Sequence, residues 1–551
     1  MAKDILNKFK ILLVLIVLCF STHNAISEIH YDSLKWNLNI NNISSLFRNT
    51  GVFDAGPLTN TNPGGFEWPK GSGKSAIFSA GLTIAGYLNN QLRMAAASYQ
   101  GEYAPGYIIN INGIPVTRVD SRFRFYKVTR GDNQYNNPDW LTWGNMVPFG
   151  APFTDVNHNG IYDTAIDTPG VKGADQTIFI CLTDGFPETH TSGEGFGGGT
   201  LPIFSEVHLT AWAYNKPGLE DMQFIKWDII NKSLQTWSNA YFAVDCYPSL
   251  GNSHDDYIGC DTIRQLGYCY NADNLDSIYG YNPPAVGFLW LNCNQSNNDL
   301  HLKSFTYLIQ DNTLPCENLF VFTVDAYTLL KGVKKDGTPW VIPNTNPPRT
   351  TKFCYSGDPE TGNGWTEYGG QIKNCGNVLT GEYVHPTVPG DRFFIMSAGN
   401  GFNVPANDTN TVIIAQLIAR GTNNKNSVTK LKQLSDAARN LCSNGFVIGV
   451  NNISSEIPDS YMLYQNYPNP FNPVTKIKFD ISMDSRLRGN DNVTLKIYDI
   501  LGREVATLIN EKLTPGTYEV VWEAVNNASG VYFYKLETED YSETKKMVLM
   551  R

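Results

Sequence analysis

Alternation of apolar and polar residues is the clearest pattern along the chain, and it is strongest near the C-terminus. From Lys476 to Ile481 and from Val493 to Tyr498, every second residue is apolar. A period of two places one face of a β-strand in a core and the other in water. Further segments of this kind lie at 504–509, 518–522, 531–536 and 545–550. The pattern predicts a small immunoglobulin-like β-sandwich over residues 461–551.

The preceding part, residues 28–449, shows strand signals that are spaced more widely. These segments lie at 122–128, 176–182, 206–214, 222–230, 392–396 and 411–418. Long stretches rich in Asn, Asp, Gly and Pro separate them, as in loops. We therefore predict a mainly β protein whose β-sandwich-rich ectodomain has long loops and room for two subdomains. Residues 450–460 are expected to link it to the C-terminal domain.

One segment has the helical period. Between Asn426 and Leu441, apolar residues recur at the spacing of one helix face. They are Val428, Leu431, Leu434, Ala438 and Leu441. The pattern predicts one amphipathic helix at the end of the ectodomain.

The first residues have the layout of a signal peptide. Lys3, Lys8 and Lys10 precede the apolar run Ile11 to Phe20, and Ala25 to Ser27 offers small residues for cleavage. The run is shorter than the roughly 20 residues that span a bilayer. We predict a signal peptide at 1–27 and a mature chain without a transmembrane segment.

Composition narrows the function classes. The net charge is −10 and charged residues make up 17% of the chain. Nucleic-acid binding needs clustered Lys and Arg, so we expect no nucleic-acid partner. Ten Cys are present, and Cys19 in the leader leaves an odd number. In an exported protein disulfides are the usual use of Cys, and Cys246, Cys260 and Cys269 are close enough in sequence to supply one; free buried thiols are the alternative.

The C-terminal segments also carry a family resemblance. YQNYPNPFNPVTKIKFDI from Tyr464, VTLKIYDILGREVATLIN from Val493 and ASGVYFYKLETEDYSETKKMVLMR from Ala528 follow one another in order. They resemble the type A C-terminal sorting domain of type IX secretion, with a longer polar insert at 485–492. The resemblance implies that residues 461–551 engage the type IX machinery, and that the protein is secreted or displayed at the cell surface. In the ectodomain, GGFEWPKGSGKSAIFSAGL from Gly64 and VTKLKQLSDAA from Val428 resemble an uncharacterised group of type IX cargo proteins, for which no activity is known.

One loop has the residue pattern of a calcium site. Oxygen-bearing side chains recur at Asp155, Asn157, Asn159 and Asp163, and Gly160 permits a sharp turn. This is the first part of an EF-hand-type loop, in which the main-chain carbonyl of residue seven also binds the ion. The complete predicted metal set is Asp155, Asn157, Asn159, Ile161, Asp163 and Asp167. Position twelve is Ile166, so Asp167 would act one residue late; an Asx-rich turn without metal is the alternative.

Motifs typical of catalytic sites match this sequence less well than the calcium-loop pattern does. Gly71 to Ser75 lacks the first glycine of a P-loop, and His190 and His254 lie beside carboxylates at spacings typical of polar loops. We therefore expect a non-catalytic ectodomain that is adhesive, structural or glycan-binding, with an extracellular glycan or protein as ligand. The alternative is a secreted hydrolase acting on polysaccharide or protein, because a glycosidase needs only two carboxylates.

Overall fold

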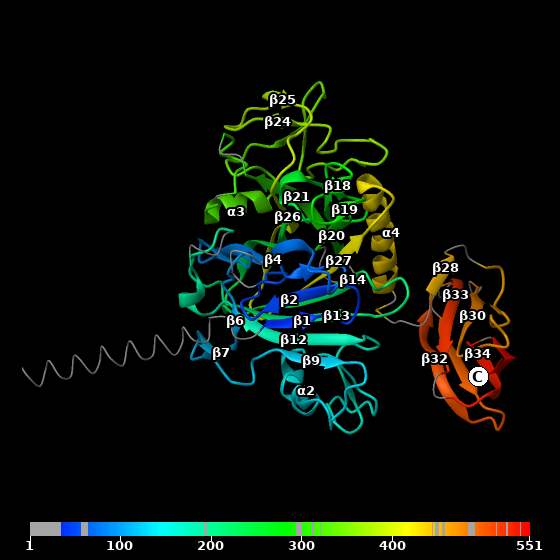
Figure 1. Cartoon of the computed structure of the whole chain (residues 1–551). Coiled ribbons are helices and arrows are strands. Elements are labelled where there is room, and N and C mark those ends of the chain that lie inside the picture. Colours follow the sequence, from blue (N-terminus) through cyan, green and yellow to red (C-terminus); the bar gives the residue numbers. More distant parts are fainter. Residues whose placement is uncertain are drawn as a thin grey trace, which may run out of the picture. The chain divides into compact units, whose positions relative to one another are not determined.

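The chain folds into two compact units, Met1–Cys442 and Ser443–Arg551. The computed structural model describes residues 35–550 except 57–63, 192–195, 292, 294–299, 311–312, 320, 444, 447–450, 455–457, 483–490, 514, 525–526 and 540 (Figure 1). The predicted signal peptide lies outside the described residues, as do parts of the predicted linker and most of the polar insert.

The first unit contains an eight-stranded antiparallel sheet in the order β1-β2-β3-β4-β15-β26-β21, with β5 beside β4 (Figure 1). Its strands are β1 (Lys35–Leu38), β2 (Ser44–Arg48), β3 (Phe66–Glu67), β4 (Ser75–Leu88), β5 (Gln91–Ala95), β15 (Trp237–Pro248), β21 (Leu302–Ile309) and β26 (Arg392–Val404).

A nine-stranded antiparallel sheet has the order β16-β17-β20-β27-β14-β13-β12-β6, with β9 also pairing with β12. Its strands are β6 (Ala104–Pro105), β9 (Tyr126–Thr129), β12 (Gln176–Thr183), β13 (Ser205–Ala213), β14 (Met222–Asn231), β16 (Asp256–Asp261), β17 (Leu266–Asn271), β20 (Ala285–Leu291) and β27 (Thr409–Ala419).

The two sheets share one apolar core. Buried side chains from the first sheet, such as Phe242 and Phe394, pack in one cluster with Trp227 and Phe288 from the second. Burying such aromatic surface is the main favourable term in folding. The ectodomain is therefore a β-sandwich, and the predicted mainly β class is confirmed.

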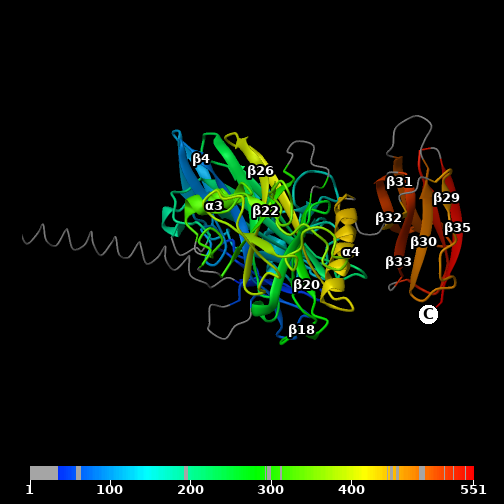
Figure 2. The same ribbon diagram turned by 90° about the horizontal axis from the view of Figure 1, so that it is seen from above.

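Short elements cover the outer faces. Helix α3 (Thr323–Leu330) packs on the first sheet through Ala326 and Leu329. Helix α4 (Asn424–Ser443) lies on the opposite side of the ectodomain in both views (Figure 1 and Figure 2). On the predicted helix face, Val428, Leu431 and Ala438 are buried, whereas Leu434 and Leu441 are half-buried.

The remaining elements of this unit form small hairpins and turns. They are β7 (Tyr107–Ile111), β8 (Ile114–Arg118), β10 (Phe153–Thr154), β11 (Thr168–Pro169), β18 (Leu275–Asp276), β19 (Gly280–Tyr281), β22 (Trp340–Ile342), β23 (Arg349–Thr351), β24 (Gln371–Lys373), β25 (Glu382–Val384), α2 (Pro138–Thr142), η1 (Trp143–Asn145), η2 (Val147–Phe149), η3 (Pro187–Thr189) and η4 (Ser253–Asp255).

The second unit is a smaller sandwich of two four-stranded sheets, β28-β33-β30-β29 and β32-β31-β34-β35. Its strands are β28 (Asn451–Ser454), β29 (Met462–Leu463), β30 (Val474–Ile481), β31 (Asp491–Tyr498), β32 (Glu504–Leu513), β33 (Gly516–Glu523), β34 (Gly530–Glu537) and β35 (Ser542–Leu549). Alternate residues enter its core as predicted: Ile477, Phe479 and Ile481 are buried on β30.

The expected disulfide among Cys246, Cys260 and Cys269 is wrong. All three thiols are free and buried. The disulfides join Cys293 to Cys442 and Cys316 to Cys375. Sequence proximity misled the prediction, because Cys246 lies in one sheet and Cys260 and Cys269 lie in the other.

Candidate functional site

The predicted calcium loop joins β10 to β11, which pair with each other at its base. The carboxylate of Asp155 accepts hydrogen bonds from the main-chain N–H of Asn159 at 3.2 Å and of Gly160 at 2.7 Å. The side-chain oxygen of Asn159 accepts the N–H of Ile161 at 2.7 Å. Gly160 has φ +76°, a value that side chains disfavour. The loop therefore turns sharply where the motif requires it.

Asp167 closes this loop. It is 2% exposed, and its two oxygens accept the N–H groups of Val156 at 2.8 Å and of Asp163 at 2.7 Å. Its position one residue beyond the standard spacing thus places it at the base of the loop. Ile161 is 68% exposed, so its side chain takes no part in a core and the loop is accessible to solvent.

The residue types fit a hard cation, since carboxylate, amide and carbonyl oxygens are the ligands that calcium takes. The carboxylates of Asp155, Asp163 and Asp167 are not among the described groups of three or more His, Cys, Asp or Glu side chains whose ligand atoms lie within 4.8 Å of one another. This grouping considers only His, Cys, Asp and Glu side chains, so it does not include the amide oxygens of Asn157 and Asn159 or the carbonyl oxygen of Ile161.

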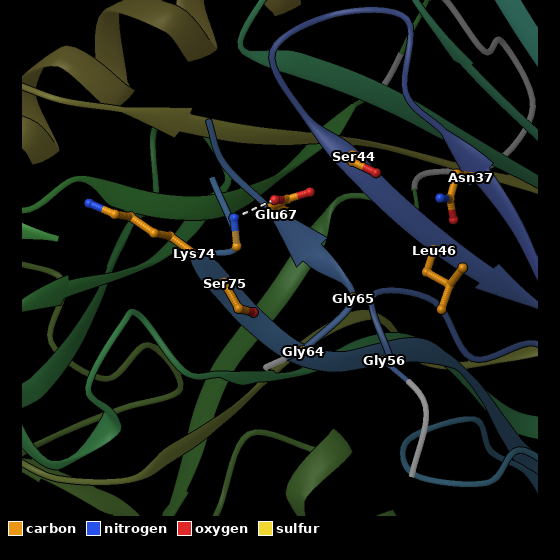
Figure 3. Close-up of a pocket in the computed structure, with 10 residues that line it drawn as sticks. Asn37, Ser44, Leu46, Gly56, Gly64, Gly65, Glu67, Lys74 and Ser75 are labelled. Atoms are coloured by element: carbon orange, nitrogen blue, oxygen red, sulfur yellow. Dashed lines mark hydrogen bonds between the residues drawn. The ribbon is translucent and has the colours of Figure 1, made fainter. Parts of the chain in front are cut away.

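The glycine-rich segment Gly71 to Ser75 forms a turn between β3 and β4. It borders a surface pocket of about 290 Å³, in which the N–H of Gly73 donates to Glu67 at 2.6 Å (Figure 3). The segment leads into a strand, whereas a P-loop leads into a helix whose N-terminus binds phosphate. The geometry does not support nucleotide binding.

His190 is held between two carboxylates. Its Nδ1 lies 3.4 Å from Glu102 and its Nε2 lies 3.4 Å from Asp184, and the imidazole is 1% exposed. Burial alone would lower the pKa of His190, but hydrogen bonds and negative charge from Asp184 and Glu102 outweigh burial and raise this pKa to about 10. A histidine that stays protonated and enclosed is suited to stability, not to acid–base catalysis.

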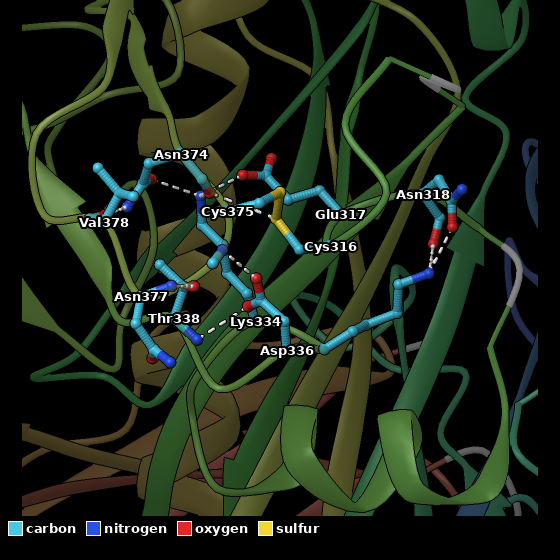
Figure 4. The surroundings of a disulfide bond; sticks show 12 residues. Cys316, Glu317, Asn318, Lys334, Asp336, Thr338, Asn374, Cys375, Asn377 and Val378 are labelled. Atoms are coloured by element: carbon cyan, nitrogen blue, oxygen red, sulfur yellow. Dashed lines mark hydrogen bonds and ion pairs between the residues drawn. A yellow bond between two sulfur atoms is a disulfide. The ribbon is translucent and has the colours of Figure 1, made fainter.

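A buried ion pair lies beside the disulfide Cys316–Cys375 (Figure 4). Lys334 contacts Glu317 at 2.5 Å, and both side chains are at most 1% exposed. Nearby, Arg392 contacts Glu367 at 2.7 Å, with 4% and 0% exposure. Such pairs are matched charges inside the fold, where each partner compensates the desolvation of the other.

Sequence reasoning missed one group of side chains whose residue types could hold a metal ion. Cys181, Glu206 and His208 lie on neighbouring strands β12 and β13, with ligand atoms within 4.8 Å of one another. Cys181 and His208 are register partners, and Glu206 is two residues before His208. The only signal was the strand alternation that puts Glu206 and His208 on one face; pairing with Cys181 requires the sheet register.

Exposed aromatic rings gather near β24 and β25. Tyr383 stacks on His385 with ring centres 6.0 Å apart, and Tyr368 packs edge-on against His385 at 5.7 Å. Lys425 lies 5.3 Å from the centre of the Tyr368 ring. Tyr368 and Tyr383 are 51% and 40% exposed. By contrast, Trp143 and Trp365 are buried.

The tip of the β31–β32 hairpin exposes two apolar residues, Ile500 at 72% and Leu501 at 73%. Asp499 fixes this turn by accepting hydrogen bonds from the N–H of Leu501 at 2.9 Å and of Arg503 at 3.0 Å. The turn borders a hollow of about 400 Å³ that includes Phe533 and Lys535.

Within the part of the chain that the structure describes, no helix is long and apolar enough to cross a membrane.

Comparison with known proteins identifies the second unit. Residues 465–550 match the family described as the secretion system C-terminal sorting domain. No curated protein matches the chain. Among solved structures, the chain is compared with PorZ of Porphyromonas gingivalis, described as an essential bacterial surface component of the type IX secretion system. The sequences are 11% identical, the comparison covers 94% of this chain and 57% of the PorZ chain, and the TM-score of 0.12 carries no structural argument. The sorting domain makes this chain a type IX secretion cargo protein that is exported to the cell surface or secreted.

Proposed function

We propose that the exported ectodomain is a non-catalytic binding domain whose loop at 155–167 is stiffened by calcium. The observation that carries the proposal is the loop itself. Asp155 and Asn159 already direct oxygens inward onto main-chain N–H groups, and Gly160 supplies the sharp turn. A bound calcium ion would neutralise the carboxylates of Asp155 and Asp163 and restrict a long connection between β10 and β11.

The test is calorimetric titration and thermal unfolding of the purified chain with calcium. Binding at 100 times the dissociation constant would stabilise the folded state by about 2.7 kcal/mol. We expect Asp155→Ala and Asp163→Ala to abolish both the heat and the rise in melting temperature. Asp273→Ala is a matched control, because this exposed aspartate also accepts a main-chain N–H, that of Leu275 at 2.8 Å. Absence of heat in the unmodified chain would reduce the loop to an Asx-rich turn.

We further propose that the exposed rings of Tyr368, Tyr383 and His385 contact the extracellular ligand, which we take to be a glycan. Tyrosine suits such a surface because it offers apolar area together with a hydroxyl group. The test is retention of the chain on insoluble polysaccharides. Tyr383→Ala should reduce retention at least tenfold, whereas Tyr135→Ala, which removes an isolated ring exposed by 89%, should not. Equal loss in both variants would refute the assignment.

For the sorting domain, we propose that Ile500 and Leu501 contact the secretion machinery. Large apolar side chains held in water by a rigid turn are typical of interaction sites. Ile500→Ser with Leu501→Ser should trap the protein in the periplasm without unfolding it. Normal export of this variant would exclude the tip as a contact.

A further inference from the structure

The group formed by Cys181, Glu206 and His208 lies on the outer face of the nine-stranded sheet. Leu182 and Val207, the neighbouring residues, belong to the core between the sheets, so Cys181 and His208 project to the other side. There they meet β7, whose Ile108 N–H donates to Glu206 at 2.9 Å. Three segments of the chain therefore converge on these side chains.

The spacing of the ligand atoms suits a tetrahedral metal ion. His208 Nε2 lies 3.1 Å from Glu206 Oε1. Nitrogen and oxygen ligands that each lie 2.0–2.2 Å from zinc are about 3.3–3.6 Å apart at the tetrahedral angle, so a small adjustment of the two side chains would admit the ion. The thiol sulfur of Cys181 completes a triangle in which all ligand atoms lie within 4.8 Å.

The ligand types select the metal. A thiolate and an imidazole favour zinc and similar transition metals, whereas calcium and magnesium take oxygen ligands. The other described group of this kind, Cys316, Asp336 and Cys375, differs because its two sulfurs are joined in a disulfide.

The surroundings hold the ligands in place. A Cβ atom at Gly150 would come within 2.8 Å of His208 Nδ1, so the backbone of Gly150 lies directly against the imidazole. The ring of Phe149 packs edge-on against the same imidazole, with centres 6.4 Å apart. Packing on both sides restricts the orientation that the imidazole can take.

We propose that Cys181, Glu206 and His208 bind a zinc ion that ties β7, β12 and β13 together. The thiol loses its proton to solvent when the metal–sulfur bond forms, and a water takes the fourth position. The ammonium of Lys232, 3.7 Å from Glu206 Oε1, competes with the metal for this carboxylate. Without metal, Glu206 keeps its contact with His208, and the Cys181 thiol donates to the carbonyl of Gly106 at 3.3 Å.

The test uses the full chain after treatment with a chelator, in buffer that contains calcium, with cobalt as a spectroscopic substitute for zinc. A cobalt–thiolate bond gives a charge-transfer absorption that oxygen ligands do not give. We expect one cobalt ion per chain with this absorption, and its loss when zinc is added.

Variants then assign the ligands. Cys181→Ala should abolish the charge-transfer absorption, and His208→Gln should weaken cobalt binding at least tenfold. Lys232→Met should strengthen binding. Cys260→Ala is the matched control, because Cys260 is equally buried and its thiol also contacts a main-chain carbonyl, that of Cys354 at 3.2 Å; this variant should keep the absorption.

A wild-type chain without the absorption overturns the proposal, and so does an absorption that persists in Cys181→Ala. The wild-type result stands whether or not the Cys181→Ala chain folds, which far-ultraviolet circular dichroism would show. Asp155→Ala should leave the cobalt absorption intact, so failure of the calcium proposal is distinguishable from failure of this one.

Discussion

The two units of this protein differ in where their ion pairs lie: the described pairs of the sorting domain are all partly exposed, whereas the ectodomain has buried pairs in addition to exposed ones. In the sorting domain, ion pairs lie at the surface: Lys476 and Glu519 are 2.9 Å apart, and the Lys476 side chain is 57% exposed. In the ectodomain, Arg392 and Glu367 form a pair of similar length with 4% and 0% exposure. A charge that is taken out of water depends on its partner, whereas an exposed charge is solvated regardless. The ectodomain should therefore be much more sensitive to loss of a single charge.

The largest expected effect comes from breaking a buried pair. Arg392→Met leaves the buried Glu367 carboxyl without its cation, which should lower the free energy of unfolding by about 3–5 kcal/mol. Calorimetry of the purified chain measures this change. The double variant Glu367→Met with Arg392→Met should recover most of the stability, because no unpaired charge remains; equal loss in both variants would show that packing, not charge, is responsible.

The next largest effect is expected from removal of the disulfide Cys316–Cys375. Cys316 and Cys375 are separated by 59 residues. Closing a loop of this length in the unfolded chain corresponds to about 2–4 kcal/mol of stability. Replacing both residues by Ala should lower the melting temperature accordingly. The matched control is Cys260→Ala, which removes a free buried thiol and should cost less; a smaller effect from the double variant than from the control would contradict the prediction.

Replacement of the buried acid Asp54 should increase stability, unlike the two changes above, and the size of the increase should depend on pH. Asp54 is fully buried and accepts hydrogen bonds from Ser45 and Gln416, and burial raises its pKa from 3.8 to about 7 despite these bonds. Because the folded state holds the proton more tightly, the stability contributed by Asp54 falls as pH rises from about 4 to about 7. Asp54→Asn should therefore stabilise the protein clearly more at pH 8, where folding keeps an unfavourable charge in the core, than at pH 4, where Asp54 is protonated in the folded state. Thermal unfolding across this range tests it, and a gain that is independent of pH would exclude titration of Asp54 as the cause.

The smallest effect is expected in the sorting domain. Lys476→Gln removes an exposed ion pair and should change stability by less than about 1 kcal/mol, and less still in high salt. Chemical unfolding of the second unit measures the change. If Lys476→Gln lowered the free energy of unfolding as much as Arg392→Met does, the proposed difference between the two units would be wrong.

The same contrast explains what the sequence could predict. Strand β34 alternates between exposed or half-buried and buried residues, so its period is visible in the sequence. All residues of β4 except Phe78 and Tyr87 are buried, so both faces of this strand lie against other parts of the protein. Hydrophobic periodicity then fades, and β4 and β15 were not recognised at all.

The candidate sites divide in a similar way. The calcium hypothesis for the loop at 155–167 could be formed from the sequence, because its residues are contiguous and their spacing has a chemical meaning. The contacts of Asp167 with Val156 and Asp163 depend on the folded loop, yet they lie within the same segment. The placement of His190 between Glu102 and Asp184, and of Cys181 beside His208, depends on sheet register and could not be read from spacing.

The disulfide between Cys293 and Cys442 has a mechanical consequence. Cys442 lies in the last turn of α4, the final helix before the sorting domain, and it is bonded to a residue 149 positions earlier. A force that pulls on the C-terminal unit reaches the ectodomain at this cross-link, where a covalent bond carries the load. The hydrogen bonds of α4 are thereby shielded, so tension during passage through a pore or at an anchored surface would not unwind the helix from its end.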